Sequence, residues 1–130
     1  MATITVTCPI FPSEDPERVK QAVLNIFPDA VLDICGDTVR TEDPGMEHFG
    51  EQIRKQRILD ATRSVMMKGR RGNGRTAFNM NKQAAYAGRI SFVEERAVLG
   101  TIKVTMEAED ITTFIELLVP HTVNGEEVRI

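Results

Sequence analysis

A chain of 130 residues fits one domain and can bury a core without help from a metal or a disulfide. Its formal charge of −3 is modest, and its two histidines and two cysteines are scattered, so no zinc site is expected and Cys8 and Cys35 should be reduced and buried. No apolar stretch approaches the roughly 20 residues that cross a bilayer, and the N-terminal MATITVTCPI lacks a basic leader, so a cytoplasmic location is expected.

The first third of the chain predicts a strand, a helix and a hairpin. Alternating apolar residues over 4–10 indicate the strand, and Asp15 before Pro16 is typical of a capped helix start. That helix should end at Pro28-Asp29. Residues 30–34 and 38–42 are then expected to pair as a hairpin.

Residues 46–68 predict one long helix whose apolar face shifts along its length. Phe49 and Ile53 share one face, whereas Ile58, Thr62 and Val65 share another. Either the helix breaks near position 56, or its two halves pack on different partners. We favour a change of partner, because neither glycine nor proline lies between the two sets.

The second half predicts a loop, three strands, a helical turn and a last helix. Segment 69–74 holds three glycines and should be a flexible exposed loop. The strands are expected over 76–80, 89–93 and 101–107, and the turn over 81–88. Asp110 should cap the last helix, which stops at Pro120.

This order of elements predicts an α+β fold with one mostly antiparallel sheet and helices packed on one face. A single domain is expected over residues 1–120, followed by a polar tail over 121–130.

Positive charge is concentrated in the middle of the chain. Residues 54–89 hold ten of the 16 Lys and Arg residues and one of the 19 acids. An acidic body with a basic segment is typical of a protein that binds a polyanion, although surface ion pairs with the acidic remainder would also account for it. The candidate RNA-binding residues are Arg54, Arg57, Lys68, Arg70, Arg71, Arg75, Asn81, Lys82, Gln83, Tyr86 and Arg89.

The basic residues are expected to form a continuous phosphate-binding surface. On one unbroken helix Arg57 and Lys68 would point the same way, about 16 Å apart, with the small Ala61 between them. The segment GRRGNGR matches neither a Walker A loop nor a dinucleotide fingerprint. Its arginines and free backbone amides instead predict a mobile basic loop that orders on RNA.

The residues after this loop leave two interpretations open. Asn81 and Gln83 could read base edges or the 2′-hydroxyl, or Asn81 could cap the helical turn while Gln83 ties down a loop. Tyr86 is the one plausible stacking platform, because the other rings are assigned to apolar faces. Contacts to backbone and shape are therefore expected, as on structured or double-stranded RNA.

Catalysis has little support in the sequence. The histidines are isolated, and the acidic clusters at 14–17 and 107–110 lie at helix starts, where the helix dipole explains them. We expect no catalytic residue, metal or cofactor. Two other functions stay open: a module that docks an acidic protein, and a small phosphoester or nucleotide enzyme with Asp60 and His48 beside the basic loop.

Four blocks of the sequence resemble a known family when taken in order. They are VKQAVLNIFPDA at 19–30, QRILDATRSVMMKG at 56–69, FNMNKQAAYAG at 78–88 and LGTIKVTME at 99–107. Together they resemble the archaeal uncharacterised protein family 0201, which is grouped with predicted RNA-binding proteins and a predicted exosome-associated branch.

The resemblance spans about Ile4 to Pro120. It implies a fold similar to that of the ribosomal protein that holds 5S rRNA, and an RNA partner. It also allows a homodimer and a place in an RNA-processing assembly. It supplies no active site, and the lengthened GRRGNGR segment and the tail after Pro120 depart from the common pattern.

Overall fold

The computed structural model of the chain describes residues 2–93, 100–119, 122–123 and 126–127. Within these residues one sheet has the strand order β2-β3-β1-β7-β5-β4, with β6 paired to β5, and every pairing is antiparallel. Its strands are β1 (Thr3–Pro9), β2 (Asp33–Cys35), β3 (Thr38–Glu42), β4 (Arg70–Arg71), β5 (Arg75–Asn81), β6 (Phe92–Val93) and β7 (Thr101–Glu107).

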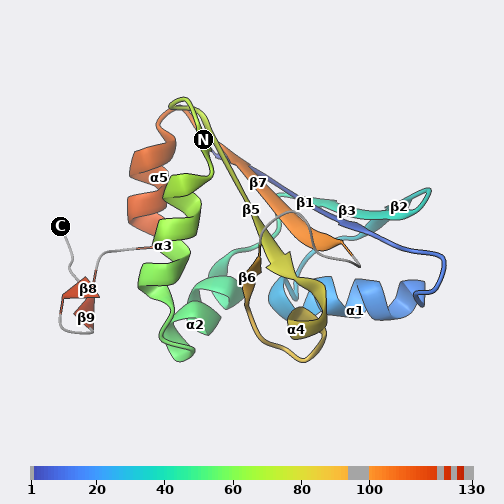
Figure 1. The fold of residues 1–130 in the computed structure, drawn as a ribbon. Helices are drawn as coiled ribbons and strands as arrows, with labels where there is room; N and C mark the ends of the chain where they lie inside the picture. The colour runs from blue at the N-terminus through green and yellow to red at the C-terminus, as the bar shows by residue number, and fades with distance from the viewer. Residues whose placement is uncertain (1, 94–99, 120–121, 124–125, 128–130) are drawn as a thin grey trace.

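The helices gather on one face of this sheet, as the sequence predicted (Figure 1). They are α1 (Pro16–Ile26), α2 (Glu47–Lys55), α3 (Leu59–Lys68), α4 (Lys82–Tyr86) and α5 (Ile111–Leu118). A separate small ladder pairs β8 (Thr122–Val123) with β9 (Glu126–Glu127). The expected α+β fold is confirmed.

Alternation along the two central strands builds the core. Ile102, Val104 and Met106 of β7 are fully buried, as their spacing predicted. The residues between them turn to the other face of the sheet, where Thr105 lies opposite Thr5 of β1. Phe49 lies in the middle of the core, with its ring centroid 6.1 Å from those of both Phe27 and Phe78.

Two aspartates cap helices at the positions that the sequence predicted. Asp15 accepts a hydrogen bond from the backbone N–H of Glu17 at the start of α1. Asp110 accepts from both the backbone N–H and the hydroxyl of Thr113 at the start of α5. These hydrogen bonds favour the ionised form and lower the pKa of Asp110.

The expected long helix is two helices, so our preference for an unbroken one was wrong. α2 ends at Lys55 and α3 begins at Leu59, and Arg57 between them adopts the left-handed conformation with φ 58°. This turn lets two displaced apolar faces reach the core, with Ile53 on one helix and Met66 on the other. A left-handed arginine costs about 1 kcal/mol, which the burial of these side chains offsets.

The glycine-rich segment is the turn end of a β-hairpin, so the prediction that it forms a loop without strands was wrong. β4 and β5 pair directly, and Gly72 at the turn has a φ of 68° that glycine adopts without strain. The tip is also fastened to the start of α5, because the Asn73 carbonyl accepts from the Ile111 N–H at 2.8 Å. The base is closed by Gly69, where an added Cβ would collide with the Ala77 carbonyl oxygen.

The two cysteines differ in environment. Cys8 is buried in the core, and burial raises its pKa from 9.0 to about 11. Cys35 is exposed on β2, so the expectation that both thiols are buried was wrong for this one. β2 lies at the edge of the sheet, which leaves its side chains uncovered.

None of the helices described here is both long enough and apolar enough to span a membrane.

Candidate nucleic-acid interface

The exposed basic residues of segment 54–89 divide into two groups, one at each end of α3. The hairpin cluster lies where α3 passes into the β4–β5 hairpin and consists of Lys68, Arg70, Arg71 and Arg75. The junction cluster lies at the α2–α3 connection and consists of Arg54, Lys55, Arg57 and Arg89. In Figure 1 the hairpin is at the top of the molecule and the α2–α3 connection is at the bottom.

The hairpin cluster holds like charges close together on ordered backbone. Arg71 and Arg75 are direct cross-strand partners, so their side chains leave the same face of the hairpin. Arg70 is oriented by two hydrogen bonds, from Nε to the Met67 carbonyl at 3.0 Å and from Nη1 to the Thr112 hydroxyl at 2.9 Å. Like charges directly opposite one another are unfavourable without an anion between them.

Among the described residues, no carboxylate forms an ion pair with a member of the hairpin cluster. Acids do lie nearby, because Glu107 is the cross-strand neighbour of Arg75 on β7 and is itself exposed. Asp110 is engaged as the cap of α5. The four cations therefore remain available to an anion from outside.

The junction cluster depends on contacts that sequence spacing does not reveal. Gln56 donates to the Ile90 carbonyl at 3.0 Å and accepts from the Ile90 N–H at 2.9 Å. Gln52 donates to the Gly88 carbonyl at 3.1 Å. These bonds hold the chain around Arg89 against the C-terminal end of α2, which carries Arg54.

Small side chains connect the two clusters along α3. Ala61 and Ser64 are exposed on this helix, and Lys68 follows at its C-terminal end. Ten residues of helix separate the clusters by about 15 Å. The low cationic face that the sequence predicted is thus interrupted by the turn at Arg57, and the basic surface has two centres instead of one continuous line.

Lys82 does not belong to the exposed basic surface, and that expectation was wrong. Its side chain is only 6% exposed, and its ammonium donates to Glu14 at 2.9 Å and to the Pro9 carbonyl at 2.7 Å. The ammonium also lies 5.1 Å from the centroid of the Phe11 ring. The Lys82 ammonium is therefore part of an internal ion pair and not of a surface for external anions.

Asn81 caps α4, which is the structural alternative that the sequence left open. Its side-chain oxygen accepts from the Ala84 N–H at 2.8 Å. Gln83 and Tyr86, on the same short helix, are exposed. Tyr86 keeps 46% of its surface accessible, with the Arg18 guanidinium carbon 5.5 Å from its ring centroid.

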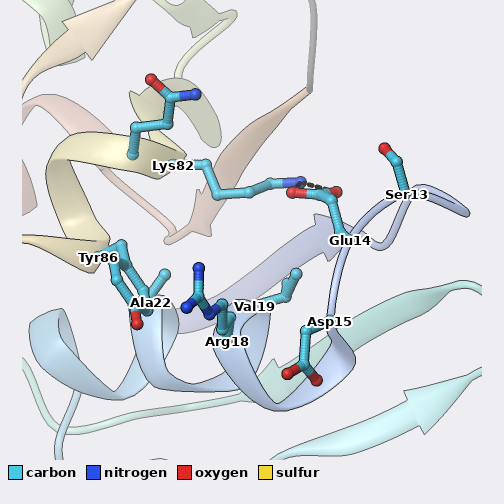
Figure 2. Close-up of a pocket in the computed structure, with 9 residues that line it drawn as sticks. Ser13, Glu14, Asp15, Arg18, Val19, Ala22, Lys82 and Tyr86 are labelled. Carbon is cyan, nitrogen blue, oxygen red and sulfur yellow. Dashed lines mark hydrogen bonds and ion pairs between the residues drawn. The ribbon is translucent and has the colours of Figure 1, made fainter.

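Gln83, Tyr86 and the buried Lys82 line a pocket of about 480 Å³ between α1 and α4. Figure 2 shows Lys82 reaching toward Glu14 along the upper side and Arg18 beside Tyr86 along the lower side. The remaining lining residues are Ser13, Asp15, Val19 and Ala22. Sequence reasoning missed Arg18 because it lies in the acidic stretch SEDPER, outside the basic segment.

The described residues hold no group of three or more His, Cys, Asp or Glu side chains that could bind a metal. Asp60 lies in the first turn of α3, at the end opposite to the hairpin cluster, and His48 lies in the first turn of α2. The arrangement that would favour a phosphoester enzyme, with both residues beside the basic loop, is therefore not found in this part of the chain.

Comparison with known proteins agrees with the resemblance noted in the sequence. Residues 3–108 match a family model described as RNA binding. A UPF0201 protein of Methanothermobacter thermautotrophicus is 38% identical over 98% of this chain and 98% of its own length. A UPF0200/UPF0201 protein of Archaeoglobus fulgidus is 40% identical over 97% of this chain, which spans only 40% of that longer relative.

The fold agrees as well. The crystal structure of a UPF0201 protein from Methanococcus jannaschii superposes with a TM-score of 0.86 at 34% identity, covering 98% of this chain and 99% of that one. The implied similarity to the 5S rRNA-binding ribosomal protein stays a prediction, as do the homodimer and the cytoplasmic location. The sequence and the fold together show that the chain belongs to the UPF0201 family, and its residues 3–108 match the family model described as RNA binding.

Proposed function

We propose that this protein binds structured or double-stranded RNA through phosphate contacts from the hairpin and junction clusters. The hairpin cluster carries the proposal, because it places four exposed cations on and beside a paired β-hairpin without an ion-pair partner among the described carboxylates. Arginine forks are suited to phosphate oxygens, and a polyanion relieves the repulsion between Arg71 and Arg75.

The spacing of the two clusters favours a structured partner. They lie at opposite ends of α3, about 15 Å apart, with exposed Ala61 and Ser64 leaving the helix surface low between them. A single strand tracked by stacking would need several exposed rings. Tyr86 is the one large aromatic side chain among the exposed hydrophobic residues of the described chain.

Family membership supports an RNA partner in general terms, through the description of the matched model. It does not specify the segment that makes contact. We assign the contacts to Arg54, Arg57, Lys68, Arg70, Arg71, Arg75 and Arg89. Lys82 is left out because Glu14 already neutralises it.

The test is an affinity panel of duplex, hairpin and single-stranded RNAs of equal length, with polyglutamate as an acidic protein-like probe. We expect the duplex and hairpin to bind several-fold more tightly than the single strand, and polyglutamate to bind weakly. No RNA binding near 0.1 M salt would overturn the proposal. Tighter binding of polyglutamate than of RNA would favour a module that docks an acidic protein.

A further inference from the structure

The pocket between α1 and α4 combines features that suit one flat, uncharged ring. Tyr86 is 46% exposed as a whole residue, and the Arg18 guanidinium carbon lies over its ring, 5.5 Å from the centroid. Val19 and Ala22 of α1 supply an apolar lining. At about 480 Å³ the pocket falls within the range of small-ligand sites, about 300–1,000 Å³.

The charges around the pocket argue against a phosphate group as its occupant. Glu14 and Lys82 neutralise each other in a pair whose side chains are 15% and 6% exposed. Asp15 remains at the mouth as a carboxylate that caps α1, which opposes an anion at this helix N-terminus. The Arg18 guanidinium and the Asp15 carboxylate therefore leave the pocket lining without a net positive charge for a phosphate.

Hydrogen bonds join the elements on the two sides of the pocket. Lys82 joins α4 to the segment before α1 through Glu14 and the Pro9 carbonyl. Asn25 joins the far end of α1 to α4 by donating to the carbonyls of Ala85 and Tyr86, each at 3.0 Å. Such cross-links reduce the conformational entropy that ordering the pocket around a bound ring would cost.

The pocket is also adjacent to the proposed phosphate contacts. Arg89 of the junction cluster follows Tyr86 by three residues, and its backbone N–H donates to the Ala84 carbonyl at 2.9 Å. Three residues of chain span at most about 11 Å. An RNA whose phosphate lies on Arg89 could thus place a neighbouring base on Tyr86.

We propose that this pocket binds a single unpaired nucleobase of the RNA, stacked against the paired Tyr86 ring and Arg18 guanidinium. Ser13, Asp15 and Gln83 also line the pocket and carry the kinds of hydrogen-bonding groups that recognise a base edge. This inference rests on the proposed function, because the junction cluster brings the RNA to the pocket. A base site here would make the protein prefer duplexes that carry a bulged nucleotide.

The test compares three duplexes of the same sequence: perfect, with a one-nucleotide bulge, and with an abasic bulge. The wild-type protein should bind the base-carrying bulge about tenfold more tightly than the other two, as expected for one base–aromatic stack. Tyr86→Leu should abolish this preference without changing affinity for the perfect duplex, and Tyr86→Phe should retain it. Equal affinity for the abasic and base-carrying bulges would overturn the inference, because bending alone would then explain any preference.

A second measurement separates the failure of this inference from the failure of the proposed function. If the perfect duplex binds and no bulge preference is seen, the pocket inference fails alone. If no RNA binds, free 2-aminopurine riboside is titrated into the wild-type and Tyr86→Leu proteins. Quenching by the wild type alone would assign the pocket to a free nucleobase ligand, and equal fluorescence with both would overturn a base site.

Discussion

The hairpin cluster and Lys82 of the α1–α4 pocket come from the same basic segment of the chain, but their charges have opposite fates. At the hairpin, Arg70 and Arg71 are exposed and make hydrogen bonds only to neutral groups among the described residues. At the pocket, Lys82 is buried and paired with Glu14. Positive charge along a sequence therefore predicts a binding surface only where the fold leaves it unneutralised.

The hairpin arginines and Lys82 differ in exposure and pairing because different parts of the protein lie next to them. The hairpin projects from the sheet edge formed by β4, so its side chains meet solvent. Lys82 begins α4, which packs against α1, and the loop before α1 supplies an acid. Burial of the Lys82 ammonium is tolerated only because the Glu14 carboxylate pairs with it and hydrogen bonds satisfy both groups.

The largest expected effect is the loss of stability when the buried pair is broken. Lys82→Met should lower the free energy of unfolding by about 3 kcal/mol, because the Glu14 carboxylate is left without its partner. Denaturant unfolding measures this. The double variant Lys82→Met with Glu14→Gln should recover much of the loss. A small change in stability together with weaker duplex binding would mean that Lys82 acts on the surface instead.

Substitutions in the hairpin cluster should instead reduce RNA affinity and leave stability nearly unchanged. Replacing Arg70 and Arg71 with alanine should weaken duplex RNA binding by roughly tenfold, because two phosphate contacts are lost. The free energy of unfolding should change by less than about 1 kcal/mol, since both side chains are exposed. Fluorescence anisotropy and denaturant unfolding on the same preparation provide both values, and a large stability loss with unchanged affinity would assign these arginines to the fold.

Replacing Asn81 should give the smallest effect, and it distinguishes a capping role of this residue from an RNA contact. Asn81→Ala should lower stability by about 1 kcal/mol through loss of the cap on α4. Affinity for the perfect duplex should stay the same. Weaker RNA binding at unchanged stability would show that the amide contacts RNA and that the cap is dispensable.

Local chemistry was predictable from the sequence, and long-range pairing was not. The caps at Asp15 and Asp110 and the alternation along β7 depend on neighbouring residues, so their patterns are visible in the sequence. The turn at Arg57 has no glycine or proline to signal it. The conflict between the two apolar faces was the available signal, and it indicated the break that we did not favour.

The candidate site was predictable to a similar extent. The exposed members of the basic segment follow from composition, because nearby acids are scarce there. The burial of Lys82 depends on Glu14, 68 positions earlier in the chain, and spacing gives no sign of that contact. Nothing in the sequence indicated that Arg18 belongs to the pocket. Its place over Tyr86 depends on the packing of α1 against α4, which is again a long-range contact.

The most direct test of the hairpin cluster as an RNA-binding surface is the dependence of duplex affinity on salt. If about five phosphates are contacted, the logarithm of the association constant should fall with a slope on the order of −4 against the logarithm of salt concentration. The Arg70→Ala, Arg71→Ala double variant should flatten this slope by about 2. A matched control, Lys20→Ala with Arg40→Ala, removes two cations that are paired with Glu17 and Glu42 and should leave the slope unchanged. Equal slopes for the wild type and the hairpin variant, or equal flattening by both variants, would contradict a localised phosphate-binding surface.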